Sequence, residues 1–183
     1  YTNYVKLRFG FAHPVYLTQT LINSTCSKHL LLEGTSMGSK LYTKEHRIRF
    51  SECDPAGIVF YPQYFVMFNN LMEQWIDTML PDGFNGLITH RKVGMPTVHL
   101  EADFRSISQM GDDVVLNLGV KKIGSRSLEL QLQCVGKDGV LRMEVKQIIV
   151  TTSLITHHAI AVPEFLRTPM QDYLLTVEAT TLS

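Results

Sequence analysis

The residues best suited to chemistry lie in one short stretch, Cys53 to Tyr64, which reads Cys-Asp-Pro-Ala-Gly-Ile-Val-Phe-Tyr-Pro-Gln-Tyr. Asp54 stands in a tight, glycine-containing loop directly before a predicted helix. The first backbone N–H groups of a helix have no partner inside the helix, and they favour negative charge. A carboxylate beside such amides can act as a nucleophile or as a general base. We interpret the stretch as an active-site loop, although Asp-Pro followed by Gly is also ordinary turn chemistry.

A long amphipathic helix is predicted after the loop. Pro62 suits the first turn of a helix, and apolar residues then recur at steps of three and four. These residues are Phe65, Phe68, Met72, Trp75 and Met79, with Leu71 and Ile76 widening the stripe. The pattern indicates about five turns, ended by Pro81-Asp82-Gly83. We expect the apolar stripe to face the core.

The remaining pattern is typical of strands. Alternation of Ile48 and Phe50 with polar residues predicts a half-buried strand over 45–51. After a glycine-containing connection over 84–93, alternation returns in four runs, at 98–105, 114–120, 128–134 and 141–152. Short turns between these runs favour an antiparallel meander, and a short helix is expected from Val162. One strand, one long helix and four strands predict a single α+β domain.

Composition limits the possible partners. Lys+Arg and Asp+Glu both number 17, so no net basic field points to nucleic acid.

The three cysteines, Cys26, Cys53 and Cys134, lack metal or disulfide spacing, which predicts a reducing cytoplasm. Cys53 could be a nucleophile, but the sequence shows no partnered His nearby. No apolar stretch approaches the roughly 20 residues of a membrane span, and the histidines lack ligand spacing. We therefore expect a soluble protein without metal or cofactor.

The first part of the chain differs from the rest. Residues 1–36 show no clear period, and polar residues interrupt each apolar cluster. We expect this N-terminal extension to be disordered or foreign to the natural protein. Met37-Gly38-Ser39 looks like a natural beginning. The domain is therefore predicted to occupy residues 37–183.

The loop resembles a known signature. The segment Phe50 to Tyr64 closely resembles the 4-hydroxybenzoyl-CoA thioesterase family of hotdog-fold proteins, and similarity continues at 93–98, 112–114 and 159–163. The resemblance implies a hotdog fold, a curved antiparallel sheet of about five strands wrapped around one long helix. It also implies hydrolysis of an acyl-CoA substrate, in a homodimer or homotetramer with active sites between subunits.

The resemblance also implies roles for individual residues. Asp54 corresponds to the catalytic aspartate, and the backbone N–H of Tyr61 to the group that holds the thioester oxygen. Gly57 would let the loop backbone approach the ligand, and Glu73 is an alternative catalytic carboxylate. Acyl-pocket positions carry Phe60, Asn69, Glu73, Met95 and Thr97. Because CoA carries phosphates, a cation should also lie near the pocket mouth, and Arg126 is our candidate.

Several alternatives stay open at this point. Asp54 could attack directly or activate water, and the acyl group could be an aroyl group such as 4-hydroxybenzoyl or a short aliphatic chain. A hotdog hydratase would need a His and acid pair, but neither the loop nor the following helix contains a His. A non-catalytic acyl-CoA-binding protein would have no use for Asp54 beside a thioester.

Overall fold

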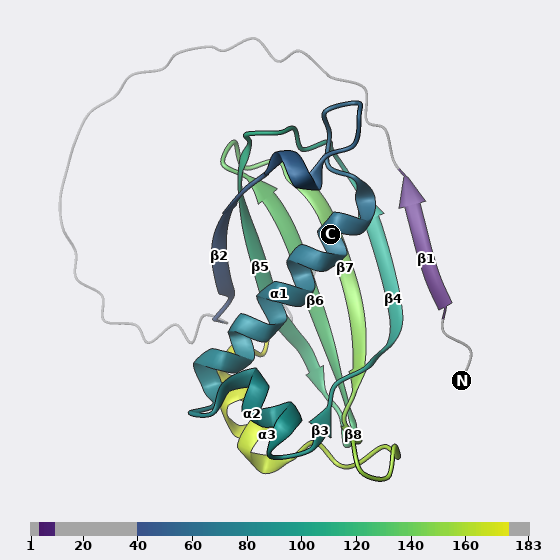
Figure 1. Cartoon of the computed structure of the whole chain (residues 1–183), viewed down its shortest axis with the longest axis vertical. Coiled ribbons are helices and arrows are strands. Elements are labelled where there is room, and N and C mark those ends of the chain that lie inside the picture. The colour runs from purple at the N-terminus through teal and green to yellow at the C-terminus, as the bar shows by residue number, and fades with distance from the viewer. Residues whose placement is uncertain (1–3, 10–39, 176–183) are drawn as a thin grey trace, which may run out of the picture.

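A computed structural model of the chain describes residues 4–9 and 40–175. Its centre is a curved six-stranded sheet in the order β1-β4-β7-β6-β5-β2 (Figure 1). The strands are β1 (Tyr4–Phe9), β2 (Tyr42–Arg47), β4 (Thr97–Phe104), β5 (Asp113–Ile123), β6 (Ser127–Gly136) and β7 (Leu141–Val150). Neighbouring strands are antiparallel, except that β1 runs parallel to β4.

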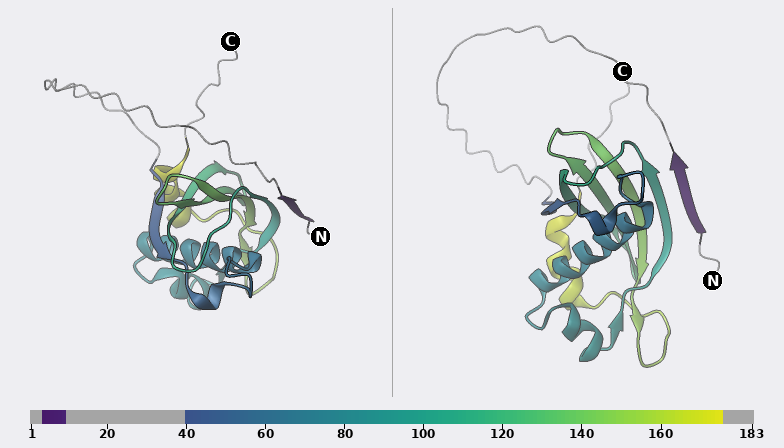
Figure 2. Two further views of the ribbon diagram at one scale, coloured as in Figure 1. Left: turned by 90° about the horizontal axis from the view of Figure 1, so that it is seen from above. Right: turned by 45° about the horizontal axis from the view of Figure 1, so that its top comes forward.

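One long helix, α1 (Tyr61–Met79), crosses the concave face of this sheet (Figures 1 and 2). The smaller elements gather at the two ends of α1. A short 3-10 helix, η1 (Phe50–Glu52), lies beside the start of α1. The opposite end carries α2 (Gly83–Thr89), α3 (Glu164–Met170), η2 (Gln171–Tyr173) and the paired strands β3 (Val93–Gly94) and β8 (Thr152–Ser153).

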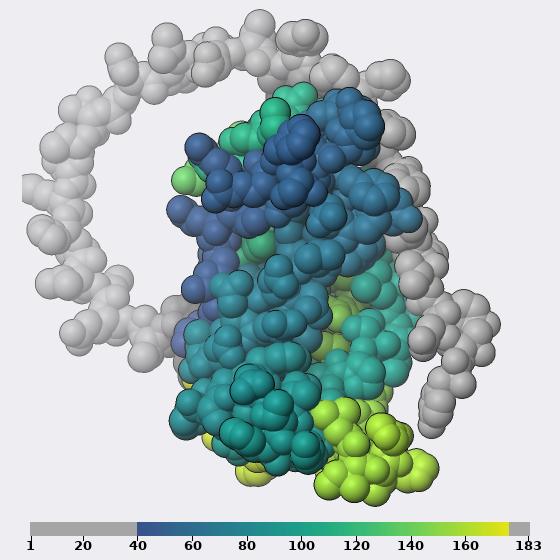
Figure 3. Space-filling model, in the orientation of Figure 1, coloured from purple at the N-terminus to yellow at the C-terminus, as the bar shows by residue number. Residues whose placement is uncertain are grey.

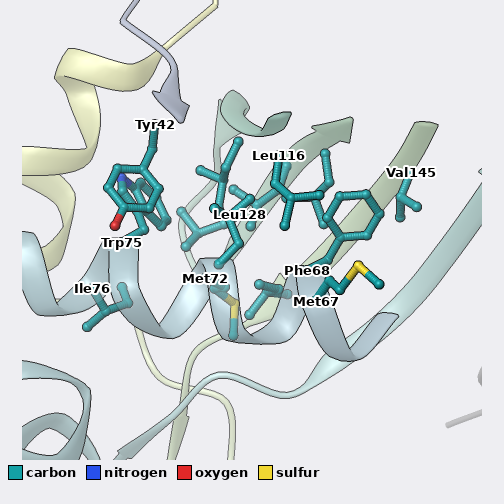
Figure 4. Close-up of a cluster of buried hydrophobic side chains, with 14 of the residues drawn as sticks. Tyr42, Met67, Phe68, Met72, Trp75, Ile76, Leu116, Leu128 and Val145 are labelled. Atoms are coloured by element: carbon teal, nitrogen blue, oxygen red, sulfur yellow. The ribbon is translucent and has the colours of Figure 1, made fainter. Parts of the chain in front are cut away.

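The core lies between α1 and the sheet. Alternate residues of β5 and β6 are almost fully buried, because their side chains point from one face of the sheet toward the helix. The helix contributes its apolar stripe to the same cluster (Figure 4), including Met67, Phe68, Leu71, Met72, Trp75 and Ile76. This arrangement confirms the predicted hotdog architecture and the predicted helix.

The strand predicted over 45–51 is placed wrongly. It lies earlier, at β2, and the chain then turns into η1. Glu52 explains the turn, because its carboxylate and its own N–H both bond to the backbone of Arg49. Phe50 is consequently 81% exposed rather than half-buried.

Two connections also differ from the prediction. The segment 84–93 contains most of helix α2, which is too short to show a helical period. The predicted meander holds for β5, β6 and β7, but β4 pairs with β7 and lies far from β5 in the sheet order. The eight residues between β4 and β5 therefore pass over the end of the sheet, where Ile58 and Gln109 form an isolated bridge.

Part of the N-terminal extension joins the sheet. Tyr4–Phe9, within the segment expected to lie outside the domain, forms β1, with Cα partners from Tyr4↔His99 to Phe9↔Phe104. Residues 10–39 lie outside the described part of the chain, and so does Cys26. Within the described ranges, no helix is long and apolar enough to cross a membrane.

The core packing gives a first testable prediction. Leu130 is fully buried at the centre of β6, so Leu130→Ala should lower the free energy of unfolding by about 2 to 5 kcal/mol through lost apolar contacts and a residual cavity. Val66→Ala is the matched control, because Val66 on α1 is 51% exposed and its loss should cost about 0.5 kcal/mol or less. Urea unfolding measures both, and equal effects would contradict this description of the core.

Candidate active site

The Asp54 loop is a small closed structure. The Phe60 N–H donates to the Glu52 carbonyl at 2.9 Å, and the Asp54 N–H donates to the Ile58 carbonyl at 2.9 Å. These two hydrogen bonds form the neck of the loop. Within the loop, the Gly57 N–H donates to the Asp54 carbonyl, also at 2.9 Å. Gly57 has a φ of +76°, a left-handed conformation that glycine adopts without steric cost. The turn therefore favours glycine at this position.

A second segment holds the loop from outside. The Val59 N–H donates to the Ser108 carbonyl at 3.0 Å, and the Met110 N–H donates to the Gly57 carbonyl at 3.2 Å. The connection between β4 and β5 is thus joined to the loop on both sides of Ile58. This attachment fixes the loop relative to the sheet.

The Asp54 carboxylate is half-buried and has one fixed oxygen. Oδ1 accepts the N–H of Ala56 at 2.8 Å, the hydrogen bond of an Asx turn. No hydrogen bond from the described residues reaches Oδ2. The local turn therefore orients the carboxylate while leaving one oxygen available for reaction.

The start of α1 offers a free donor. Phe60 is the N-cap residue and supplies no side-chain cap, and Pro62 has no N–H. Within the part of the chain that the structure describes, the Tyr61 N–H has no hydrogen-bond partner. It also lies at the positive end of the helix dipole. This amide is well suited to stabilise a negatively charged oxygen.

Asp54 and Tyr61 line the same pocket, which has a volume of about 370 Å³. In the space-filling view, the loop and the start of α1 lie together at one end of the molecule (Figure 3). The pocket is lined by Asp54, Ile58, Val59, Phe60, Tyr61, Tyr64, Phe104, Arg105, Ser106, Ile107 and Ser108. Edge-to-face contacts join Phe104 to Tyr61 and to Tyr64. The walls are thus mainly aromatic and aliphatic.

One wall contains a buried hydroxyl pair. The Tyr64 hydroxyl donates to Ser108 Oγ at 2.9 Å, and both residues are buried. Burial raises the pKa of Tyr64 to about 12, against the opposing effect of the Ser108 hydrogen bond. Tyr64 therefore stays protonated and shapes the pocket rather than acting as a base.

Arg105 supplies positive charge. Among the described residues that line this pocket, it is the only cation. One of its N–H groups donates to Asp103 Oδ2 at 3.1 Å, and a guanidinium has five such donors. The remaining donors can reach an anionic group of a ligand.

The structure separates the other predicted residues. Asn69 and Thr97 line a second cavity of about 220 Å³ between α1 and β4. Glu73 accepts a hydrogen bond from the Asn69 amide at 2.7 Å. Met95 is buried and does not line the Asp54 pocket, and Arg126 lies in the turn between β5 and β6, at the opposite end of the sheet. Of the predicted site residues, Asp54, Phe60 and Tyr61 line the Asp54 pocket of a single chain, and Gly57 lies in the adjoining turn.

Cys53 is a poor candidate nucleophile. Burial, followed by the nearby carboxylates of Glu52, Asp54 and Asp112, raises the pKa of its thiol. A raised pKa lowers the thiolate fraction at neutral pH. Among the described residues, no group of three His, Cys, Asp or Glu side chains could hold a metal ion.

Comparison with known proteins identifies the superfamily and the fold. Residues 48–170 match the model of the thioesterase-like superfamily, which covers well over half of the chain. The chain belongs to the thioesterase-like superfamily. The predicted enzyme class, a thioester hydrolase, and the predicted acyl-CoA thioesterase activity are supported at this level. The specific family named from the loop motif is not resolved by this match.

Individual relatives are more distant. A 1,4-dihydroxy-2-naphthoyl-CoA hydrolase from Synechocystis is 24% identical over 130 residues, 70% of this chain and 88% of that protein. A 4-hydroxybenzoyl-CoA thioesterase from Pseudomonas is 30% identical over 89 residues, 44% of this chain and 57% of that protein. A structure of a 4-hydroxybenzoyl-CoA thioesterase variant with 4-hydroxybenzoyl-CoA superposes with a TM-score of 0.65 at 23% identity, over 71% of this chain and 98% of that one. The structural likeness establishes a common fold.

Tyr64 and the segment Phe104 to Ser108 line the pocket but are not among the predicted site residues. Tyr64 could have been found, because it lies three residues after Tyr61 and therefore on the same helix face. The segment Phe104 to Ser108 gave little signal, apart from the apolar Ile107 among polar residues. Its place in the pocket depends on the pairing of β4 with β7.

Gly57 gives a prediction with a matched control. Gly57 and Gly139 both have left-handed φ values, +76° and +79°, and a Cβ at either position would meet no atom within 4 Å. Gly57→Ala and Gly139→Ala should each cost about 1 to 2 kcal/mol of stability, because an L-residue is strained there. Only Gly57→Ala should also lower thioester hydrolysis, by more than about tenfold, because the strained turn carries Asp54. Equal hydrolysis by the two variants would contradict a role for this turn.

Proposed function

We propose that this protein hydrolyses aroyl-CoA thioesters to the free acid and CoA. One observation carries the proposal. Asp54 and Tyr61 line the same pocket, whose other walls are largely apolar. Among the described residues, Asp54 Oδ2 and the Tyr61 N–H have no hydrogen-bond partner. A thioester carbonyl needs a nucleophile or base on one side and a hydrogen-bond donor for its oxygen. The loop before α1 supplies the first group, and the first residue of α1 supplies the second.

The mechanism follows from these groups. Attack by Asp54 Oδ2 forms a C–O bond and moves electrons onto the thioester oxygen, which the Tyr61 N–H stabilises. Collapse breaks the C–S bond and releases the CoA thiolate, and water then hydrolyses the mixed anhydride. In the alternative, Asp54 removes a proton from water that attacks instead. One well-placed donor to the oxyanion contributes about 3 to 4 kcal/mol to either route.

The pocket walls favour an aromatic acyl group. Its volume is within the range of about 300 to 1,000 Å³ found for small-molecule sites. Phe60, Tyr61, Tyr64 and Phe104 offer ring edges and faces to a planar group. The relatives named above act on naphthoyl-CoA and benzoyl-CoA compounds. A short aliphatic acyl group is the alternative, because the same residues accept it without specific contacts.

We also propose a homodimer or homotetramer with active sites between subunits. Apolar side chains at the pocket end are exposed, including Phe60, Tyr61, Ile107 and Met110. Contiguous exposed apolar surface is typical of interfaces. Arg126 lies at the far end of its own sheet, so it can approach CoA phosphates only from a second copy. A cytoplasmic location is proposed from the cysteines, since Cys53 and Cys134 are free.

Asp54→Asn tests the chemistry. The variant should lower kcat for aroyl-CoA at least about 100-fold, since an amide is neither a base nor an effective nucleophile. Asp172→Asn is the control, because Asp172 is exposed in η2 and should leave kcat unchanged. A thiol-release assay with aroyl, short and long acyl-CoAs measures both variants beside the wild type.

Two outcomes would overturn the proposal. One is a wild-type protein that releases CoA from none of these substrates, and the other is full activity of Asp54→Asn. Single turnover in H₂¹⁸O, followed by mass spectrometry of the Asp54 peptide, tests for direct attack. Water that opens the anhydride at the Asp54 carbonyl places ¹⁸O in the Asp54 carboxylate, whereas the general-base route never labels this carboxylate.

Arg105→Gln tests the predicted anion contact. The KM for aroyl-CoA should rise about tenfold with kcat nearly unchanged, because a lost charge-assisted hydrogen bond costs about 1.5 kcal/mol or more. Arg91→Gln is the control, since Arg91 pairs with Asp82 after α1, away from the pocket. Steady-state kinetics measure kcat and KM for both variants. An unchanged KM in Arg105→Gln would exclude the contact.

A further inference from the structure

An imidazole and a carboxylate meet just before the Asp54 loop. His46 Nε2 lies 2.9 Å from Oε1 and 3.0 Å from Oε2 of Glu52. Oε2 also accepts the backbone N–H of Arg49 at 2.6 Å. The side chains are largely buried, with 15% of Glu52 and 27% of His46 exposed. Both carboxylate oxygens are therefore held in place.

Glu52 also forms one side of the loop's neck. Its backbone carbonyl accepts the Phe60 N–H, the bond that closes the loop. Asp54 follows Glu52 by two residues, and Tyr61 follows Phe60 directly. A displacement of Glu52 therefore moves both the reacting carboxylate and the amide that faces the thioester oxygen.

The pair is anchored to the sheet. His46 belongs to β2 and is the register partner of Val114 in β5. The other charged residues beside the pair are engaged elsewhere, with the Lys44 ammonium over the Tyr42 ring and Glu45 paired with Lys137. The helix contributes only uncharged residues to the 140 Å³ cavity beside the pair, namely Val66, Met67, Asn70, Leu71 and Gln74. Lys44 and Glu45 are therefore the other charged residues, among those described, that line this cavity.

We infer that His46 and Glu52 form a positioning dyad that holds the Asp54 loop in its reacting geometry. The inference rests on the proposed thioesterase function. Neither residue lines the Asp54 pocket, so the dyad acts through the loop rather than on the substrate. Small displacements matter here, since misplacement of a reacting group by about 1 Å can cost about 100-fold in rate.

Glu52→Gln should lower kcat about 100-fold and change KM less than about twofold. The introduced side-chain amide has one acceptor oxygen where Glu52 has two. Its NH₂ group would face another donor, either His46 Nε2 or the Arg49 N–H. His46→Ala should give a similar loss, whereas His46→Gln keeps a donor and should retain most of kcat. Glu129→Gln is the control, because it breaks the Lys146–Glu129 pair on β6 and β7 and should leave kcat unchanged.

Hydrogen–deuterium exchange provides a readout that does not need activity. The loop amides of Asp54, Gly57 and Phe60 should exchange faster in Glu52→Gln and His46→Ala than in the wild type, and Glu129→Gln should leave them unchanged. A wild-type protein without thioesterase activity would overturn the proposed function. In that case the exchange rates of the loop amides would still test whether His46 and Glu52 hold the loop. An active wild type whose Glu52→Gln and His46→Ala variants keep full kcat and full loop protection overturns the dyad. If Glu52→Gln does not fold, His46→Ala decides alone.

Discussion

The packing of α1 into the concave face of the sheet is the interaction on which the rest of the structure depends. Trp75 and Ile76 are fully buried, and the facing residues of β5 and β6 are nearly so. Each large apolar side chain removed from water contributes about 1.5 to 3 kcal/mol. This burial fixes the rotation and direction of the helix. It therefore also fixes where the helix begins, beside the end of β2 and the loop that carries Asp54.

The candidate chemistry depends on groups that the fold leaves unsatisfied. Most loop amides have partners, so the backbone is held by Glu52, Ile58 and Ser108. Within the described residues, the Tyr61 N–H and Asp54 Oδ2 have none. In a pocket with aromatic walls, such preoriented groups act more strongly on developing charge than they would in water. The candidate site therefore combines a hydrogen-bonded loop with two polar groups that have no partner among the described residues.

The strand order is the second constraint on the site. Because β4 pairs with β7 rather than β5, the chain must cross the end of the sheet between them. That crossing carries Arg105 to Ser108, which line the pocket together with Phe104 at the end of β4. It also attaches Ile58 to Gln109. The same connection therefore closes the fold and builds the pocket.

The sequence by itself determined the helix, the four later strands and the loop with Asp54 and Tyr61, because helical period, strand alternation and a contiguous motif are local properties. It misplaced the first strand, since the bonds from Glu52 to Arg49 that bend the chain leave no trace in alternation. Only the tertiary structure decided that Arg105 and Tyr64 share a pocket and that Arg126 lies at the far end. Those relations follow from strand pairing between segments distant in the chain, which no local pattern records.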